Sequence, residues 1–467
     1  MKRLLFFIVL VALSLGVRLN AQNTEYYNLQ QLPDAGIYLP APPDTSSLLF
    51  ADDFNQWVWG KSMRATQRGR QASWESYFGI ERMATVFGEA MGFVISKEKT
   101  PAIWHFMLRV GETGHKAVTL AKRKYMRKRP FARMNEHVAG EFDNEEELRG
   151  NGSYPSGHTA LGWTTALALA EMAPELQDTI LRRGFEYGQS RVIVGAHWQS
   201  DVDAARLASS AAMARMHLHP DYNKDLDAAR REFLQCYRGP RSETVVFPDS
   251  RRILDAPFDT ASRRYYADIN AHWLAKAERA TVRGSQAIAD ADNSIDAMLL
   301  CFAQSMGVAL SREQTPQIYA MLDYARKTLV AQSEAVNNNV FRKRPYVQLA
   351  ETTLIPQQEN QYRGTSSYVS AHAAIGWGLS LLLAEINPDH QNAILQRGFE
   401  YGYSRVIAGY EYASDVQAAR LMASYAVGRL HATDYFRTLV ANALSEYNQL
   451  AGKAPKPQPA RKGKRRK

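Results

Sequence analysis

The sequence has few cysteines and, beyond its first residues, no long apolar run. Cys236 and Cys301 are the only cysteines among 467 residues, too few for a disulfide-rich scaffold or a cysteine zinc cage. An oxidising compartment would permit one disulfide between them. No later segment has 18 consecutive apolar residues, so we expect no transmembrane segment in the mature chain. No stretch alternates convincingly between polar and apolar residues, which disfavours a β-sheet protein.

The N-terminus is the one strongly apolar segment. Lys2 and Arg3 precede an apolar run over residues 4–17, and a small residue follows at Ala21. This pattern predicts a cleaved signal peptide over residues 1–21, and hence a periplasmic or secreted protein. A membrane anchor is the alternative, but the run is shorter than the about 20 residues that a span needs.

Net positive charge is absent from the body of the chain. The formal net charge is +10, but the signal segment contributes three positive charges and residues 451–467 contribute eight. The remaining body is nearly neutral, and we expect no nucleic-acid partner. The tail over 451–467 is rich in Pro and Lys, which predicts disorder. It either contacts anionic lipid or polysaccharide, or it serves as a solubilising tail.

The sequence repeats itself once, at an offset of 215 or 214 residues. The segment RGFEYGQSRVIVG from Arg183 corresponds to RGFEYGYSRVIAG from Arg397. A unit of about 190 residues has the size of a domain rather than of a solenoid repeat. We therefore predict tandem domains over 43–240 and 258–450, joined by a linker over 241–257.

Both units have the composition of helical domains. Thr100 and Pro101 pair an N-cap residue with proline at the first helical position. Residues 160–172 are rich in Ala and Leu, Pro174 suits the start of the next helix, and residues 201–216 combine small and apolar side chains. The predicted fold class is all-α, with two tandem helical bundles.

Three blocks of the first unit combine residue types that suit phosphate chemistry. Lys122, Arg129 and Arg191 are cations that bind phosphate oxygens, arginine as a bidentate fork and lysine as a point charge. Ser156 and Gly157 open a helix, where free N–H groups and the helix dipole favour an anion. Glycine at this point also lets the backbone approach a ligand closely.

Two histidines and an aspartate complete these blocks. His197 and Asp201 are four residues apart and share a face if the segment is helical. Asp201 can then hold one imidazole nitrogen and leave the other as a nucleophile, while His158 donates a proton to the leaving oxygen. Singly, the blocks could be a solvated basic helix face, a helix cap and a surface ion pair worth roughly 0.3–0.5 kcal/mol. Their conjunction favours a catalytic site, with no metal ion and no cofactor.

The order Lys-x6-Arg-Pro, Pro-Ser-Gly-His, Ser-Arg-x5-His-x3-Asp resembles the signature of the phosphatidic acid phosphatase type 2 and vanadium haloperoxidase superfamily. The contexts GSYPSGHTA, RGFEYGQSRVI and HWQSDVDAAR are similar to those of class A bacterial non-specific acid phosphatases. The resemblance implies an exported, α-helical, metal-independent enzyme that hydrolyses small-molecule phosphate esters through a phosphohistidine. It implies His197 as nucleophile, Asp201 as its orienting partner, His158 as general acid, and Lys122, Arg129, Ser156, Gly157 and Arg191 as phosphate ligands.

Three other functions share parts of this pattern. A vanadium haloperoxidase would hold vanadate with the same cations and histidine. Lipid phosphatases of the superfamily are usually integral membrane proteins, and pyrophosphate cleavage is a further variant of the chemistry. A phosphate- or polyanion-binding protein without turnover would not need all three blocks. The GSYPSGHT context and the absence of spanning segments favour the phosphomonoesterase.

In the second unit the same pattern is incomplete. Asn337 stands at the position of Lys122, Val369 at that of Pro155, Ala371 at that of Gly157 and Glu411 at that of His197. A carboxylate in place of the nucleophile would repel a phosphate. We therefore predict that the second unit is not catalytic. It would instead supply a packing surface, as an intrachain pseudo-dimer, with a homo-oligomer as the other possibility.

Overall fold

The computed structural model describes residues 24–240 and 245–453 of the chain. Within these residues every regular element is an α-helix or a short 3-10 helix, which confirms the all-α prediction. The predicted signal peptide, part of the predicted linker and most of the basic tail lie outside the described residues. None of the described helices is long and apolar enough to cross a membrane.

The helices repeat in order from one half of the chain to the other. The first repeat contains α2 (Ala35–Tyr38), α3 (Phe50–Met63), α4 (Gln67–Trp74), α5 (Ile80–Met91), α6 (Pro101–Lys116), α7 (Thr119–Tyr125), α8 (Pro130–Arg133), α9 (Glu145–Arg149), α10 (Gly157–Met172), α11 (Gln177–Ile193), α12 (Gln199–His217) and α13 (Tyr222–Cys236). The second contains α14 (Ser250–Ile253), α15 (Arg263–Ala277), α16 (Val282–Ala289), α17 (Ile295–Met306), α18 (Pro316–Asn337), α19 (Pro345–Gln348), α20 (Glu359–Tyr362), α21 (Ala371–Ile386), α22 (Gln391–Ala408), α23 (Ala413–His431) and α24 (Asp434–Leu450).

The central helix of each repeat is apolar on all sides. The α10 sequence, GHTALGWTTALALAEM, suits a helix that is buried from every direction, and α6, α11 and α12 pack around it. Gly162 permits the close approach of α10 and α11, because a Cβ atom there would lie 2.3 Å from the Tyr187 ring. This packing places the N-terminus of α10 beside the C-terminus of α11, where the predicted site lies. In the second repeat α21 has the same role.

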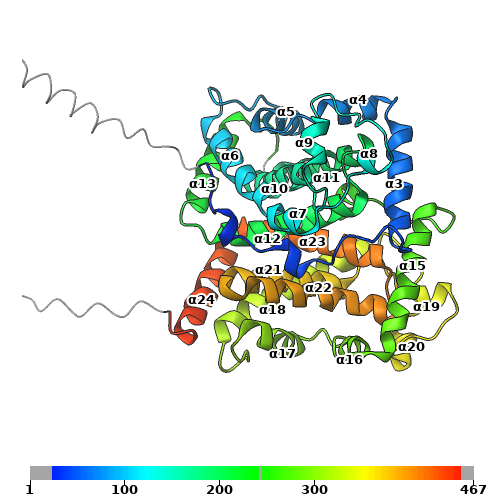
Figure 1. The fold of residues 1–467 in the computed structure, drawn as a ribbon. Helices are drawn as coiled ribbons and strands as arrows, with labels where there is room; N and C mark the ends of the chain where they lie inside the picture. The colour runs from blue at the N-terminus through cyan, green and yellow to red at the C-terminus, as the bar shows by residue number, and fades with distance from the viewer. Residues whose placement is uncertain (1–23, 241–244, 454–467) are drawn as a thin grey trace, which may run out of the picture.

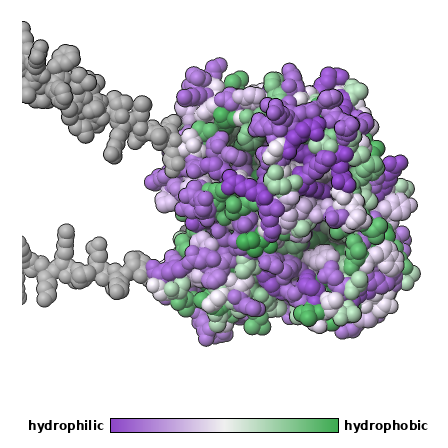
Figure 2. All heavy atoms as spheres, in the orientation of Figure 1, coloured by the Kyte–Doolittle hydropathy of each residue, from purple (hydrophilic) through white to green (hydrophobic). Residues whose placement is uncertain are grey.

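The two repeats share one core. In Figure 1 the first repeat lies above the second, with α12 and α23 between them. α10 contacts α23, α12 contacts both α21 and α23, and α3 contacts α15. Buried apolar side chains from both repeats form a single cluster. On the face drawn in Figure 2 the outer surface is largely hydrophilic, with apolar residues dispersed among polar ones. The repeats therefore associate through an extended apolar interface within one chain.

Each repeat begins with an arm that packs on the other repeat. α2 in the first arm contacts α22, and α14 in the second arm contacts α11. The backbone N–H of Asp34 donates to Asn392 Oδ1, and that of Asp249 donates to Asp178 Oδ1, both at 2.9 Å. The repeated unit therefore extends upstream of both predicted domain starts, and part of the predicted linker belongs to the second arm.

The disulfide that an oxidising compartment would permit does not form. Cys236 ends α13 and Cys301 lies within α17, and both are free. These helices occupy non-equivalent places in the two repeats, so the pseudo-symmetric pairing does not bring the thiols together. Burial raises the pKa of the Cys301 thiol to about 12.

The start of α6 is capped differently from the prediction. Thr100 occupies the N-cap position, but its side chain accepts no hydrogen bond from the first helical turn. Thr100 Oγ1 instead accepts from Ser96 N at 2.9 Å. The free N–H of Ile103 donates to Glu232 Oε2 of α13 at 2.8 Å. A carboxylate from a distant helix therefore satisfies the helix start in place of the local hydroxyl.

Candidate active site

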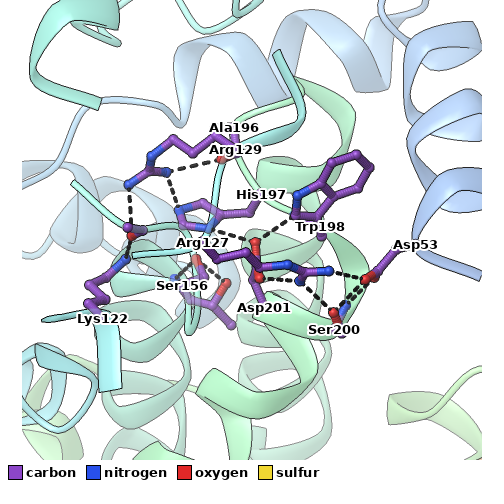
Figure 3. A network of polar contacts seen from close by, with 12 residues as sticks. Asp53, Lys122, Arg127, Arg129, Ser156, Ala196, His197, Trp198, Ser200 and Asp201 are labelled. Atoms are coloured by element: carbon purple, nitrogen blue, oxygen red, sulfur yellow. Dashed lines mark hydrogen bonds and ion pairs between the residues drawn. The ribbon is translucent and has the colours of Figure 1, made fainter. Parts of the chain in front are cut away.

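The structure brings the predicted site residues together from five separate elements. Lys122 lies on α7, Arg129 precedes α8, Ser156 and Gly157 begin α10, Arg191 lies in the last turn of α11, and His197 and Asp201 flank the start of α12. Figure 3 shows Lys122, Arg129, His197, Asp201 and Ser156 around one centre. The segments are far apart in the sequence, so it is the packing around α10 that assembles the site.

The N-terminus of α10 is capped as predicted. Ser156 is the N-cap, and its hydroxyl oxygen accepts from the backbone N–H of Thr159 at 3.2 Å. A Cβ atom on Gly157 would meet no protein atom other than Lys122 Cε, at 3.8 Å. Only the Lys122 side chain therefore borders the space beside Gly157. The helix N-terminus and the lysine both present positive potential to this space.

His197 does not lie on the helix with Asp201, which corrects the simple i, i+4 interpretation. It precedes α12 in a turn, where its backbone N–H donates to Arg191 O at 3.2 Å. The two side chains nevertheless meet, because His197 Nδ1 lies 3.4 Å from Asp201 Oδ2. A turn followed by the first helical turn therefore brings about the pairing that a continuous helix was expected to provide.

The donors around His197 fix its tautomer. Arg129 Nη1 lies 2.9 Å from His197 Nε2, and a guanidinium can only donate. Nε2 is therefore the acceptor, and the ring proton lies on Nδ1, facing Asp201. Burial and the charge of Arg129 hold the pKa of His197 well below the ordinary value for histidine. The ring is thus neutral in the free site, with its Nε2 lone pair among the cations.

Arg127, which the sequence analysis missed, holds Asp201 in place. Its guanidinium donates to Asp201 Oδ1 and to Asp53 Oδ2, each at 2.6 Å (Figure 3). Asp201 Oδ2 also accepts from Trp198 N at 2.8 Å. Burial opposes ionisation of Asp201, but Arg127 and His197 outweigh it and hold the carboxyl pKa well below its ordinary value. The aspartate is therefore a fixed anion behind the imidazole.

Comparison of the two repeats in the sequence could have predicted this network. Arg127 corresponds to Arg342 at the offset of 215, and Asp53 corresponds to Asp268. Arg342 donates to Asp415 Oδ1 at 2.5 Å and to Asp268 Oδ2 at 2.7 Å. The same aspartate–arginine–aspartate network therefore occurs in both repeats.

Two of the predicted phosphate-binding cations, Arg129 and Arg191, are buried, Lys122 is half-buried, and the three are close enough to repel one another. Lys122 Nζ donates to Gly152 O at 2.8 Å, and Arg129 Nε donates to Leu148 O at 2.9 Å. Burial and the charge of Arg129 hold the pKa of Lys122 well below its ordinary value. Burial and Arg191 lower the pKa of Arg129 to about 10. A phosphate bound here would relieve this repulsion.

Arg191 has the clearest unused donors. It is fully buried, and Arg191 Nη2 donates to Asp143 Oδ1 at 2.6 Å. Its Nε and Nη1 have no hydrogen-bond partner. Unpartnered N–H groups of a buried guanidinium are costly unless a ligand accepts from them. Asp143 is a second residue that the sequence analysis missed, because it lies in a loop without a recognisable motif.

His158 is anchored by a backbone carbonyl. His158 Nε2 lies 2.9 Å from Ser76 O, so Nε2 carries a proton and Nδ1 remains for proton exchange. The Phe78 ring packs edge-on against the imidazole, with centroids 4.9 Å apart. Burial and the charge of Arg191 hold the pKa of His158 well below the ordinary value. An anion in the site would offset the effect of Arg191 and raise this pKa.

The second repeat keeps the frame of the site but has different groups at its centre. Glu411 Oε1 lies 3.4 Å from Arg344 Nη1, and Glu411 Oε2 is buried without a hydrogen-bond partner. His372 Nε2 lies 3.0 Å from Ala291 O, as His158 does from its own carbonyl. Burial raises the pKa of Asp415 to about 6 despite Arg342. A carboxylate therefore already occupies the position where the first repeat offers an imidazole.

A helical bundle that gathers cations, a neutral imidazole and a helix N-terminus around one open space is suited to bind a phosphoryl group beside a nucleophile. Comparison with known proteins agrees with this class. The family model of the PAP2 superfamily matches residues 106–224 and 328–438, one region in each repeat. The chain belongs to the PAP2 superfamily.

Curated relatives cover less than half of the chain but most of their own length. A non-specific acid phosphatase of Providencia stuartii is 44% identical over 209 residues, which are 44% of this chain and 84% of the relative. A non-specific acid phosphatase of Salmonella typhimurium is 38% identical over 210 residues, 44% of this chain and 83% of the relative. An acid phosphatase of Zymomonas mobilis is 33% identical over 199 residues, 43% of this chain and 75% of the relative. The stretch matched in each relative therefore has about the length of one repeat.

Proposed function

We propose that the protein is an exported acid phosphatase that hydrolyses phosphate monoesters in its first repeat. The observation that carries the proposal is the geometry of His197, whose Nε2 lone pair faces the cations while Nδ1 faces Asp201. The names of the relatives, all acid phosphatases, support the reaction class. The signal-peptide pattern of residues 1–21 supports export to the periplasm or beyond.

The reaction begins with attack of His197 Nε2 on phosphorus. Arg129 donates to Nε2 in the free site, and a bound phosphoryl oxygen would take over this donor and free the lone pair. The Nε2–P bond forms as the bond from phosphorus to the ester oxygen breaks. Asp201 stabilises the positive charge that develops on the ring through the Nδ1 proton.

The leaving oxygen takes a proton from His158. Its Nε2–H is engaged with Ser76 O, so the proton that moves is the one on Nδ1 of the imidazolium form. In the second step His158 accepts a proton from water, the water oxygen bonds to phosphorus and the Nε2–P bond breaks. Lys122, Arg129 and Arg191 stabilise the charge on the three phosphoryl oxygens throughout.

The second repeat has no part in this chemistry under our proposal. Glu411 would place a negative charge against the incoming phosphate, and Asn337 removes the cation that Lys122 supplies. The counterparts of Arg129 and Arg191, Arg344 and Arg405, remain buried. We infer that the repeat acts through its packing surface, as one half of an intrachain pseudo-dimer.

Trapping the intermediate tests the proposal. The full chain is mixed with phosphorus-32-labelled p-nitrophenyl phosphate and quenched in denaturant at alkaline pH. We expect label that is lost on acid treatment, approaching one phosphoryl group per chain, and no label on the His197→Ala variant. His372→Ala, in the second repeat, is the matched control and should be labelled like the wild type. Undiminished label on His197→Ala would refute the assignment.

A further inference from the structure

A cluster of two glutamates and two histidines lies where the repeats meet, away from the phosphate site. Glu171 on α10 corresponds to Glu385 on α21, and His217 at the end of α12 corresponds to His431 at the end of α23. The two imidazole rings stack across the pseudo-symmetric interface, with centroids 3.8 Å apart and an interplanar angle of 25°. All four side chains are at most 6% exposed. The proposed reaction uses none of them.

Three atoms of this cluster converge without hydrogen-bond partners. His217 Nδ1, Glu385 Oε2 and His431 Nε2 are each buried without a hydrogen bond, although Glu385 forms ion pairs with both histidines, and they lie within 4.8 Å of one another. Glu385 Oε2 is 3.0 Å from His431 Nε2 and 3.8 Å from His217 Nδ1. Buried polar atoms that lack partners need an explanation, and three that face one point are explained by a bound cation.

The fourth side chain orients the first histidine. Glu171 Oε1 lies 3.0 Å from His217 Nε2, so Nε2 donates to the carboxylate. The Tyr222 hydroxyl donates to Glu171 Oε2 at 2.8 Å and fixes the carboxylate in turn. In the neutral imidazole, His217 Nδ1 then carries the lone pair. A carboxylate behind the distal nitrogen of a histidine is the usual arrangement around protein metal ligands.

The two glutamates differ because their neighbours differ. The second repeat has Phe436 where the first has Tyr222, so no hydroxyl engages Glu385 at this point. Gly428 stands where the first repeat has Ala214, and a Cβ atom on Gly428 would lie 2.9 Å from Glu171 Oε1. Departures from the symmetry thus hold Glu171 in the supporting position and leave Glu385 Oε2 available.

We propose that His217 Nδ1, Glu385 Oε2 and His431 Nε2 bind one divalent transition-metal ion of the zinc class, which ties the two repeats together. Imidazole nitrogen and carboxylate oxygen are zinc ligands at about 2.0–2.2 Å, so two ligands of one ion lie at most about 4.4 Å apart. The observed separations need only a small closing movement. The two carboxylates carry two negative charges, which one divalent ion neutralises when it binds to neutral imidazoles. The metal would be structural and would take no part in phosphoryl transfer.

Metal binding by the purified full chain tests the proposal. The protein is first stripped with chelator, and Zn²⁺ alone is then titrated by calorimetry with elemental analysis of the bound metal. We expect one ion per chain. The Glu385→Gln and His431→Gln variants should bind about 100-fold more weakly or not at all, and Tyr222→Phe about tenfold more weakly. His272→Gln is the matched control, because His272 is also buried and paired with a glutamate, Glu351.

A second readout keeps the test independent of whether the variants fold. Co²⁺ added to the stripped wild-type chain should give the visible absorption of a low-symmetry nitrogen–oxygen site, and Zn²⁺ should abolish it. Zn²⁺ should also raise the melting temperature of the wild type and of His272→Gln, but not of His431→Gln. A stripped wild-type chain that binds no stoichiometric Zn²⁺ in the titration overturns the proposal. So does equal binding by the wild type and a folded Glu385→Gln variant, because the ion would then be bound at another site.

Discussion

Replacing Arg127 by methionine should destabilise the fold and slow phosphoryl transfer, whereas the equivalent Arg342→Met change should only destabilise. Each arginine lies between two buried aspartates, at 2.5–2.7 Å from a carboxylate oxygen of each. Removing one partner of a buried ion pair leaves uncompensated charge and costs about 3–5 kcal/mol. Because the networks match, the cost to stability should be similar in the two variants.

The two variants should differ in their effect on catalysis. Arg127 holds Asp201, which faces the proton on His197 Nδ1. A nucleophile whose supporting carboxylate is no longer fixed should lose about 10–100-fold in kcat, equivalent to about 1.4–2.8 kcal/mol of transition-state stabilisation. In the second repeat Glu411 stands in place of the histidine, so Arg342 has no nucleophile to support. The kcat of Arg342→Met should remain within about twofold of the wild type.

Urea denaturation followed by circular dichroism measures the first effect, and initial rates of p-nitrophenyl phosphate hydrolysis measure the second. Both are recorded at 25 °C, with rates normalised to the folded fraction. If folded Arg342→Met lost as much kcat as Arg127→Met, the second repeat would contribute to catalysis. If folded Arg127→Met kept the wild-type kcat, the Asp201 network would be purely structural.

Three further predictions concern pH, metals and the second repeat. Both site histidines have a pKa below the ordinary value near 6.5 in the free enzyme. A bell-shaped pH profile has its maximum between its two pKa values, whichever group has the higher one, so kcat/KM should peak below pH 6.5. A maximum above neutrality would contradict the role of His158 as the acid. Brief chelator treatment should leave the rate unchanged, because three cations occupy the role of a metal, and a loss that a divalent ion restores would show otherwise. His372→Ala should keep near-normal turnover while His158→Ala loses about 100-fold or more, as comparison of kcat for the two purified variants would show.

The sequence was sufficient to predict the helical class and the blocks of the site, but not how they are held. Helical composition and the proline and serine positions at helix starts are local signals, so they can be recognised without knowledge of the packing. The link from Arg127 to Asp201 joins residues 74 positions apart, and no short motif encodes it. The exchanged arms depend on contacts between repeats. Comparison of the two copies, position by position, would have pointed to the arginine network but not to the arms.

The two copies also separate groups that build the site from groups that use it. The second repeat keeps Arg342 between its aspartates, and His372 remains held by a backbone carbonyl. Each of these buried polar groups has a protein partner, so losing it would cost stability whether or not a phosphate ever binds. The positions of Lys122 and His197 have changed to Asn337 and Glu411. In the first repeat, Lys122 and His197 face the phosphate site, where their full role depends on a bound ligand. At these two positions the change is the one expected when selection acts on folding alone, as in a repeat kept for its packing surface.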